Sequence, residues 1–471
     1  MRNAHQKYIC YPSVVCTEVE TEITVFPKDI SRYFKTDRKY ELAVIGLRDD
    51  MVDYFDPIAF DVPFKIEGGC LKFRYTFHRE EEYSIRFREK DSKNVIKVPL
   101  YAVKEDLWHL RPLKGDLHCH SYYSDGQDGV FGTAADYREE GFDFYALTDH
   151  NRMYPSLIQE EFYDGVDLGI CMLHGEEVHT PGSAVHIVHI GGSCSVCEKY
   201  VKQRKEFEKA VAEIEKTLPD SVPEIYRYRF ASAIWACREI KNAGGISIFA
   251  HPFWMPNVYN VSEDLCDLLF DAKIFDVFEL LNDGLTHRDN MQIALWQDQA
   301  LKGNLLPVVG SSDTHNHDFE NSSFGRSFTI VFAKENSPQA IMEAVKKGLS
   351  VACEVPRKDD SEVRVYGHSY RLVAFARFLY ENYFNESYRI CITEGALMRR
   401  YSQGEDVGAI LSALANSVSD FYKKYYGITP APVLPEKQLQ HLNKLRKAQQ
   451  ESGIITRGSK LHLTTSGGRN E

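Results

Sequence analysis

A repeated pattern of apolar strand, polar loop and helix runs from about residue 113 to 355, and it restricts the fold more than any other feature of the chain. Six short apolar segments, at 142–147, 170–173, 184–190, 245–250, 274–281 and 305–309, each end in polar residues. Helical segments at 133–140, 232–242 and 337–347 lie between them and close with Gly, as helices commonly do. Strands that alternate with helices predict a mainly parallel sheet, and this many repeats favours a barrel over an open sheet.

Side chains that can bind metal follow these strands. In an extended segment the side chains at i and i+2 point to the same side, so His118 and His120 can present two imidazole nitrogens to one point. A turn rich in Ser, Asp and Gly then brings Asp125. Further His, Asp and Glu residues stand at or just after the ends of later strands, namely Asp149, His150, Glu177, His251, Asp313 and His315. Barrels collect catalytic groups at this rim, and these side chains suit a borderline divalent metal, so the sequence predicts a metal site there.

The segments on either side of the repeat predict further domains. Residues 1–110 show short period-two patterns of aromatic and β-branched residues, which predict a small antiparallel β-sandwich-like domain. Residues 111–355 form the predicted barrel, with a Lys- and Glu-rich helical insertion at about 197–231. Residues 356–451 are predicted to form a helical appendage, and 452–471 a disordered tail.

Composition narrows the classes of function. The chain has 471 residues and a formal charge of −12, which argues against a broad electrostatic grip on nucleic acid. It contains no long apolar run and begins without the apolar core of a signal peptide, so we expect a cytoplasmic protein without a membrane partner. The eleven cysteines are scattered, with Cys194 and Cys197 as the only Cys-x-x-Cys pair, and reduced thiols are expected.

Seven motifs in the order of the chain resemble the PHP (polymerase and histidinol phosphatase) superfamily over about 113–333. They are Gly-Asp-Leu-His-Cys-His from Gly115, Ser-Asp-Gly from Ser124, Leu-Thr-Asp-His-Asn from Leu147, Gly-Glu-Glu-Val from Gly175, Val-His-Ile from Val185, Phe-Ala-His-Pro from Phe249 and Ser-Asp-Thr-His from Ser312. The resemblance implies a distorted (β/α)7 barrel whose rim binds two or three manganese, iron or zinc ions and hydrolyses phosphate esters.

Carried onto this chain, the resemblance implies nine metal ligands, which are His118, His120, Asp125, His150, Glu177, His186, His251, Asp313 and His315. Glu176 competes with Glu177, and His189 competes with His186. Asp149 is expected to orient a ligand or accept a proton. Arg288, Arg326 and Arg152 are candidates to grip phosphate oxygens, because a guanidinium can bind two of them at once.

A filled ligand set predicts a phosphoesterase in which a metal-bound hydroxide attacks phosphorus at a multinuclear His/Asp/Glu site. No Ser or Cys nucleophile is required, and Cys119 should face the opposite side of its strand. The expected partner is a small phosphorylated substrate. The alternatives are a nuclease or nucleotide phosphatase that acts on short substrates, and a non-catalytic, metal-stabilised regulatory module. Metal-dependent hydrolysis of a C–N bond usually uses a ligating lysine, and no lysine occupies a motif position.

Overall fold

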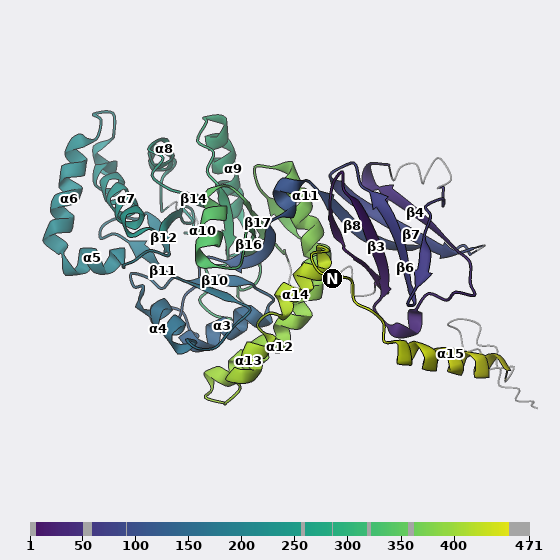
Figure 1. The fold of residues 1–471 in the computed structure, drawn as a ribbon. Coiled ribbons are helices and arrows are strands. Elements are labelled where there is room, and N and C mark those ends of the chain that lie inside the picture. The colour runs from purple at the N-terminus through teal and green to yellow at the C-terminus, as the bar shows by residue number, and fades with distance from the viewer. Residues whose placement is uncertain are drawn as a thin grey trace, which may run out of the picture.

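The computed structural model describes residues 6–49, 59–90, 92–255, 260–284, 286–317, 322–356 and 362–451. These residues form three β-sheets, and most of the helices lie around the largest of them (Figure 1). Two four-stranded sheets come first in the chain, and a ten-stranded sheet follows. The helical segments 370–402 and 417–425 lie between the two parts, so segments far apart in the sequence form one continuous body (Figure 1).

The first two sheets pack face to face. One has the order β1-β3-β6-β5 and the other β2-β8-β7-β4. Inward side chains such as Ile23 and Phe73 from one sheet and Leu42 and Ile85 from the other share a buried core. The pairing of β2 with β8 is parallel, so this edge differs from the antiparallel expectation. The strands are β1 (Tyr8–Tyr11), β2 (Val14–Cys16), β3 (Glu20–Pro27), β4 (Tyr40–Gly46), β5 (Lys65–Glu67), β6 (Cys70–Thr76), β7 (Glu81–Glu89) and β8 (Ile96–Val103), with short 3-10 turns η1 (Ile30–Arg32) and η2 (Leu47–Asp49).

The ten-stranded sheet has the order β15-β14-β13-β12-β11-β10-β9-β16-β17-β18. Its strands are β9 (Arg111–Asp116), β10 (Phe144–Leu147), β11 (Cys171–His179), β12 (His186–Ile190), β13 (Ile246–Phe249), β14 (Val277–Asn282), β15 (Val308–Ser311), β16 (Ser327–Ala333), β17 (Ser350–Glu354) and β18 (Arg364–Tyr366). All six apolar segments found in the sequence contain or overlap one of these strands.

The sheet curls until β15, at one end of the strand order, lies against β16 and β17 near the other end. Thr329 of β16 donates its hydroxyl to the carbonyl of Gly310 in β15 at 2.8 Å, and Ser350 of β17 donates to the carbonyl of Val308 at 2.8 Å. Side-chain hydroxyls therefore join these strands where no backbone ladder does. Small and branched apolar side chains from β9 to β16 fill the inside of the curl, including Leu113, Ala146, Leu173, Val188, Ile248, Val277, Val309 and Val331.

The expectation of a mainly parallel sheet is wrong. The pairs β9–β10, β10–β11, β13–β14 and β14–β15 are parallel, whereas β11–β12, β12–β13, β9–β16, β16–β17 and β17–β18 are antiparallel. The reason is visible between β11 and β12, where only residues 180–185 connect the strands. A parallel crossover needs a dozen or more residues, so this short link forces a reversal of direction.

Helices cover the outside of the curl, and their ends follow local chemistry. Ser337 caps α10 by accepting from the backbone N–H of Ala340, with Pro338 at the first helical position. Thr286 and Asp289 form a capping box at the start of α9. The helices of this part are α2 (Glu105–Trp108), α3 (Val130–Glu139), α4 (Tyr154–Phe162), α5 (Val196–Lys202), α6 (Arg204–Thr217), α7 (Glu224–Ala243), α8 (Glu263–Asp271), α9 (His287–Leu301) and α10 (Pro338–Lys346). The predicted insertion corresponds to α5, α6 and the first part of α7.

The C-terminal helices join the two parts of the molecule. Phe375 of α11 packs against Tyr101 of β8, with ring centroids 4.9 Å apart, and against Phe332 of β16 at 5.5 Å. The elements are α11 (Tyr370–Leu379), the π-helical turn η3 (Tyr380–Phe384), α12 (Asn385–Ser402), α13 (Gly408–Leu414), α14 (Ser417–Tyr425) and α15 (Glu436–Glu451). The predicted tail at 452–471 lies outside the described residues. Within the described ranges, no helix has the length and apolar content needed to cross a membrane.

Candidate metal centre

The segment after β9 carries the first two histidines of the rim. Asp313 donates its backbone N–H to the carbonyl of His118 at 3.0 Å, and His120 donates to the carbonyl of Thr314 at 3.0 Å, which keeps this segment extended beyond the strand. His118 and His120 therefore point to the same side, with their Nε2 atoms 3.2 Å apart. Cys119 points away and is buried with its Sγ 3.4 Å from the carbonyl of Ala146, as expected from the alternation of side chains.

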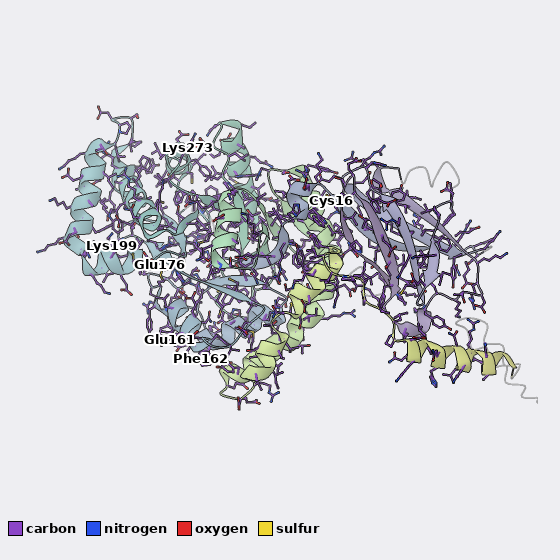
Figure 2. All side chains as sticks on the ribbon, in the orientation of Figure 1. Cys16, Glu161, Phe162, Glu176, Lys199 and Lys273 are labelled. Atoms are coloured by element: carbon purple, nitrogen blue, oxygen red, sulfur yellow. The ribbon has the colours of Figure 1, made fainter. Side chains whose placement is uncertain are left out.

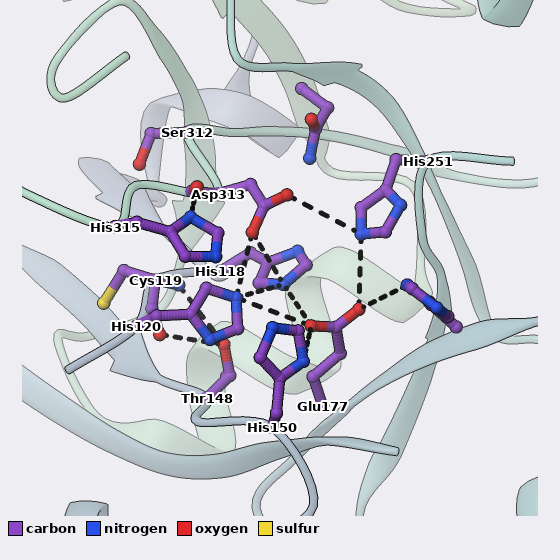
Figure 3. A network of polar contacts seen from close by, with 12 residues as sticks. His118, Cys119, His120, Thr148, His150, Glu177, His251, Ser312, Asp313 and His315 are labelled. Atoms are coloured by element: carbon purple, nitrogen blue, oxygen red, sulfur yellow. Dashed lines mark hydrogen bonds and ion pairs between the residues drawn. The ribbon is translucent and has the colours of Figure 1, made fainter. Parts of the chain in front are cut away.

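Glu177 lies at the centre of the cluster and faces a different set of imidazoles with each carboxylate oxygen (Figure 3). Its Oε2 lies 3.2 Å from His118 Nε2, 3.4 Å from His120 Nε2 and 3.0 Å from His150 Nδ1. Its Oε1 lies 3.0 Å from His186 Nδ1 and 3.3 Å from His251 Nε2. One carboxylate can thus contribute to two neighbouring metal positions.

The predicted ligands gather into three overlapping groups. In each group the potential ligand atoms all lie within 4.8 Å of one another. The groups are His118, His120, Glu177 and Asp313; Glu177, His186 and His251; and His120, Asp125, His150 and His315. All nine side chains that the family resemblance implied are therefore in the cluster.

The cluster runs from the protein interior to solvent. His118, His120 and Glu177 are fully buried, whereas the side chains of Asp125 and His315 are 58% and 38% exposed. The third group is therefore the one most open to solvent, and the first two groups lie deeper in the protein.

The residues present fit divalent ions. Both carboxylate oxygens of Glu177, His186 Nδ1 and both ring nitrogens of His251 are buried and make no hydrogen bond among the described residues. Buried polar atoms without a partner are costly, and imidazole nitrogens with carboxylate oxygens are common ligands of zinc, iron and manganese. A cation at each group would satisfy the Glu177 oxygens, His186 Nδ1 and one ring nitrogen of His251.

The charges in the cluster depend on each other. Burial lowers the pKa of His118, but the facing carboxylates of Asp313, Glu279 and Glu177 outweigh it and raise that pKa well above its ordinary value. Burial raises the pKa of Glu177, but His118 and its neighbours outweigh it and hold the pKa well below the usual range. Burial lowers the pKa of His186 to about 4, so this imidazole is neutral and free to bind metal at neutral pH.

The alternative metal ligands lie on opposite faces of the β11–β12 ladder, Glu176 opposite in direction to Glu177 and His189 opposite in direction to His186. Glu176 stands opposite His189 in the register, and the two interact at 3.0 Å on the side away from the cluster. Glu176 also accepts a hydrogen bond from the backbone N–H of Val196 at 2.6 Å and so fixes the start of α5. Figure 2 labels Glu176 close to this helix. Glu177 and His186 face the cluster because side chains alternate along both strands.

Two members of the cluster were not singled out in the sequence. Glu279 lies in the apolar strand β14 and accepts from His118 Nδ1 at 3.0 Å, which leaves Nε2 free for a metal. A single acidic residue in an apolar strand was the available signal. His179 Nε2 lies 3.0 Å from Glu177 Oε1. Its signal was its place two residues after Glu177 on one strand.

The three candidate catalytic residues, Asp149, Arg288 and Arg326, have different surroundings. Asp149 is buried and accepts from the Ser121 backbone N–H at 2.8 Å and from the Ser124 hydroxyl at 2.6 Å, so it shapes the turn that carries Asp125. Arg288 donates to the carbonyl of Trp254 at 2.6 Å and pairs with Asp283 at 3.0 Å.

Arg326 lies against Gly284, and its Nε is buried without a hydrogen-bond partner among the described residues. Ser323, three residues before Arg326, hydrogen-bonds the side chain of Asp283. The pKa of Asp283 is raised, mainly by burial, and the negative charge of Asp313 adds to the effect. The structure therefore leaves donor capacity on Arg326 near the rim, whereas Arg288 is engaged.

Comparisons with known proteins give partial structural matches. No protein-family model and no curated protein sequence matches this chain. A solved two-domain protein from Bacteroides vulgatus ATCC 8482, described as containing a predicted PHP-like metal-dependent phosphoesterase, is 22% identical with a TM-score of 0.37. The alignment covers 52% of this chain and 65% of that protein, just under two thirds of its length.

Two further solved structures are similar in part. One, from Bifidobacterium adolescentis ATCC 15703 and provisionally described as a metal-dependent phosphoesterase, is 17% identical over 44% of this chain and 90% of its own, with a TM-score of 0.31. The other, an amidohydrolase from Chromobacterium violaceum with bound sulfate and no metal, is 18% identical over 44% and 89%, with a TM-score of 0.29. Similarity at this level identifies no activity for this chain.

Proposed function

We propose that this protein is a hydrolase that cleaves phosphate esters with water at a rim site for two or three divalent ions of manganese, iron or zinc. The observation that carries the proposal is the convergence of nine side chains from widely separated parts of the chain into three overlapping groups, two of which share Glu177. We also infer that the curled sheet is the distorted (β/α)7 barrel implied by the motifs.

The side chains of the cluster would hold the ions in three groups. His118, His120, Glu177 and Asp313 would hold one ion, Glu177 with His186 and His251 a second, and Asp125 with His150 and His315 a third. When bound, such ions neutralise phosphate charge and lower the pKa of water. Glu279 keeps His118 in the orientation that presents Nε2, and Asp149 keeps the turn of Asp125 in place.

Arg326 is the side chain that we expect to bind the substrate phosphate directly. A guanidinium can donate to two phosphate oxygens, and the buried Nε of Arg326 has no other hydrogen-bond partner among the described residues. Arg326→Lys keeps the charge but loses the two-pronged geometry. We expect it to raise KM for phosphate esters about 10-fold, because one charge-assisted hydrogen bond is lost. The metal content should stay unchanged. An unchanged KM would remove Arg326 from the site.

The main test is metal analysis followed by a substrate screen. Purified protein should bind Mn²⁺ and release phosphate from small phosphomonoesters. His118→Ala and Asp313→Ala should each lower the rate about 1,000-fold, because losing an ion removes several kcal/mol of transition-state stabilisation.

His174→Gln is a matched control. His174 lies on β11 like Glu177, but it pairs with Glu160 outside the cluster. Activity that survives both ligand substitutions would refute the proposed function. Metal binding without hydrolysis of any ester would favour a regulatory module instead.

Nucleotides are a second candidate substrate, and one observation favours them. Tyr122 and Tyr123 directly follow the ligand segment, and their rings stack with centroids 4.6 Å apart. Tyr122 and Tyr154 are both more than half exposed. Exposed aromatic rings beside a phosphate site can stack on a base. Tyr122→Ala should then raise KM for adenosine monophosphate but not for glycerol 3-phosphate, and equal effects on both would exclude base stacking.

A further inference from the structure

The rim cluster contains one histidine beyond the nine predicted ligands. His179 ends β11 two residues after Glu177, so both side chains leave the same face of the strand. Its Nε2 lies 3.0 Å from Glu177 Oε1 and 3.2 Å from His150 Nδ1. The ligand atoms of these three residues all lie within 4.8 Å of one another, which is close enough for a single ion to contact all of them.

Hydrogen bonds do not account for the crowding at Glu177 Oε1. This oxygen is buried and accepts no hydrogen bond among the described residues, although His179 Nε2 and His186 Nδ1 each lie 3.0 Å away. Two imidazole nitrogens that approach a carboxylate oxygen without donating to it form an unfavourable arrangement. A cation between them removes the conflict.

The inserted helix α5 holds His179 in place. Asn151 Oδ1 accepts the backbone N–H of His179 at 3.1 Å and the hydroxyl of Tyr200 at 2.5 Å. The Tyr200 hydroxyl also lies 3.0 Å from the carbonyl oxygen of His179. The ring of His179 stacks on His186 with centroids 3.7 Å apart. Backbone and ring are thus both fixed with Nε2 directed at Glu177.

We propose that His179 is a tenth metal ligand, which binds an ion together with Glu177 and His150, and that Tyr200 and Asn151 are positioning residues for it. His150 faces this position with Nδ1 and faces Asp125 with Nε2, 3.2 Å away. A neutral imidazole offers one lone pair, so His150 serves one position at a time. His179 is therefore the ligand that distinguishes the position beside Glu177 from the position beside Asp125. Because α5 holds His179 in place, the inserted helix is part of the metal site.

This inference rests on the metal site of the proposed function but not on its reaction, so metal binding alone tests it. Metal-free full-length protein is titrated with Co²⁺, bound ions are counted by elemental analysis, and the visible absorption of Co²⁺ reports coordination. His179→Gln should weaken binding of one ion by more than about 100-fold, above the range of about 10- to 100-fold that is typical of an outer-shell partner, and should change the absorption bands. His174→Gln, on the same strand and similarly exposed, should match the unmodified protein.

Two further variants keep the test decisive if His179→Gln folds poorly. Tyr200→Phe keeps the ring and removes the hydroxyl, and it should weaken the same ion about 10-fold. His179→Glu keeps a ligand and should restore binding that His179→Gln loses.

A purely structural role for His179 would lower thermal stability and leave the Co²⁺ spectrum unchanged. An unchanged ion count, affinity and spectrum in His179→Gln, or in Tyr200→Phe if the former does not fold, would overturn the inference. Absence of phosphate release with normal Co²⁺ binding would contradict the proposed reaction and leave this inference standing.

Discussion

At the scale of single residues, Glu177 organises the candidate site. Its two oxygens face separate sets of histidines, and it is fully buried. A buried carboxylate is stable only beside positive charge. In the metal-free protein, protons on neighbouring histidines supply that charge, which explains why the pKa of His118 is raised while that of Glu177 is lowered.

Metal binding should therefore release protons. The raised pKa of His118 keeps this ring protonated at neutral pH, and a metal must displace the proton to bind Nε2. The apparent affinity for metal should fall as pH falls, because protons then compete more strongly. Calorimetry at neutral pH in two buffers of different ionisation enthalpy should show about one proton released for the ion at His118.

His186 provides the control for proton release. Its pKa of about 4 leaves it neutral before metal binds. His118→Gln should abolish the proton release assigned to that ring. His186→Gln should weaken metal binding but leave the number of protons released unchanged. Equal proton release in the unmodified protein and in His118→Gln would contradict this account of the charges.

At the scale of elements, close strand packing positions the ligands. Gly115 of β9 stands opposite Phe144 of β10, and a Cβ on Gly115 would lie 2.2 Å from the phenyl ring. The ring is fully buried, so it has no free space to move into. The close approach of β9 and β10 thus depends on a missing side chain, and His118 follows directly from β9.

Gly115→Ala should destabilise the protein by about 2 kcal/mol, the usual cost of overpacking a core. Urea unfolding measures the change. Gly132→Ala is the matched control, because Gly132 lies in α3 with open space where its Cβ would be. That substitution should stabilise by about 0.5 to 1 kcal/mol through helix propensity. Equal midpoints for both variants would show that the β9–β10 contact is not tightly packed.

At the scale of the whole molecule, the C-terminal helix α12 is packed as a structural part of the body built around the curled sheet. Arg138 of α3 and Glu394 of α12 form a fully buried ion pair at 2.7 Å, and Glu394 also accepts the backbone N–H of Gly169. Arg399 of α12 pairs with Glu139 at 2.7 Å. Burial alone would lower the pKa of Arg138, but Glu394 and the other acidic neighbours raise it, so the guanidinium stays charged.

Glu394→Ala should leave the buried guanidinium of Arg138 without its main partner. We expect a loss of about 3 to 5 kcal/mol in the free energy of unfolding, measured by urea denaturation. Glu394→Gln should lose less, because an amide oxygen can still accept a hydrogen bond. Lys216→Ala removes an exposed pair with Glu213 and should leave the midpoint unchanged. A small effect of Glu394→Ala would mean that α12 docks without this pair.

The sequence by itself determined which side chains can bind metal and roughly where the strands lie. His118, His120 and Asp313 could be predicted because their motifs combine residue chemistry with a place at a strand end. The period-two patterns within residues 1–110 likewise correspond to strands such as β3, β4 and β7, since alternating apolar residues report a half-buried strand directly.

Only the tertiary structure decided which of several similar residues face the cluster. Glu176 and Glu177 differ by the face of β11 from which they project, and that face is set by pairing with β12 rather than by local sequence. The same pairing turns His186 and His179 inward and His189 outward. Glu279 meets His118 across 161 positions of sequence, and Arg288 is engaged by Asp283 and Trp254. Such contacts depend on sheet register and curvature, which arise from long-range packing.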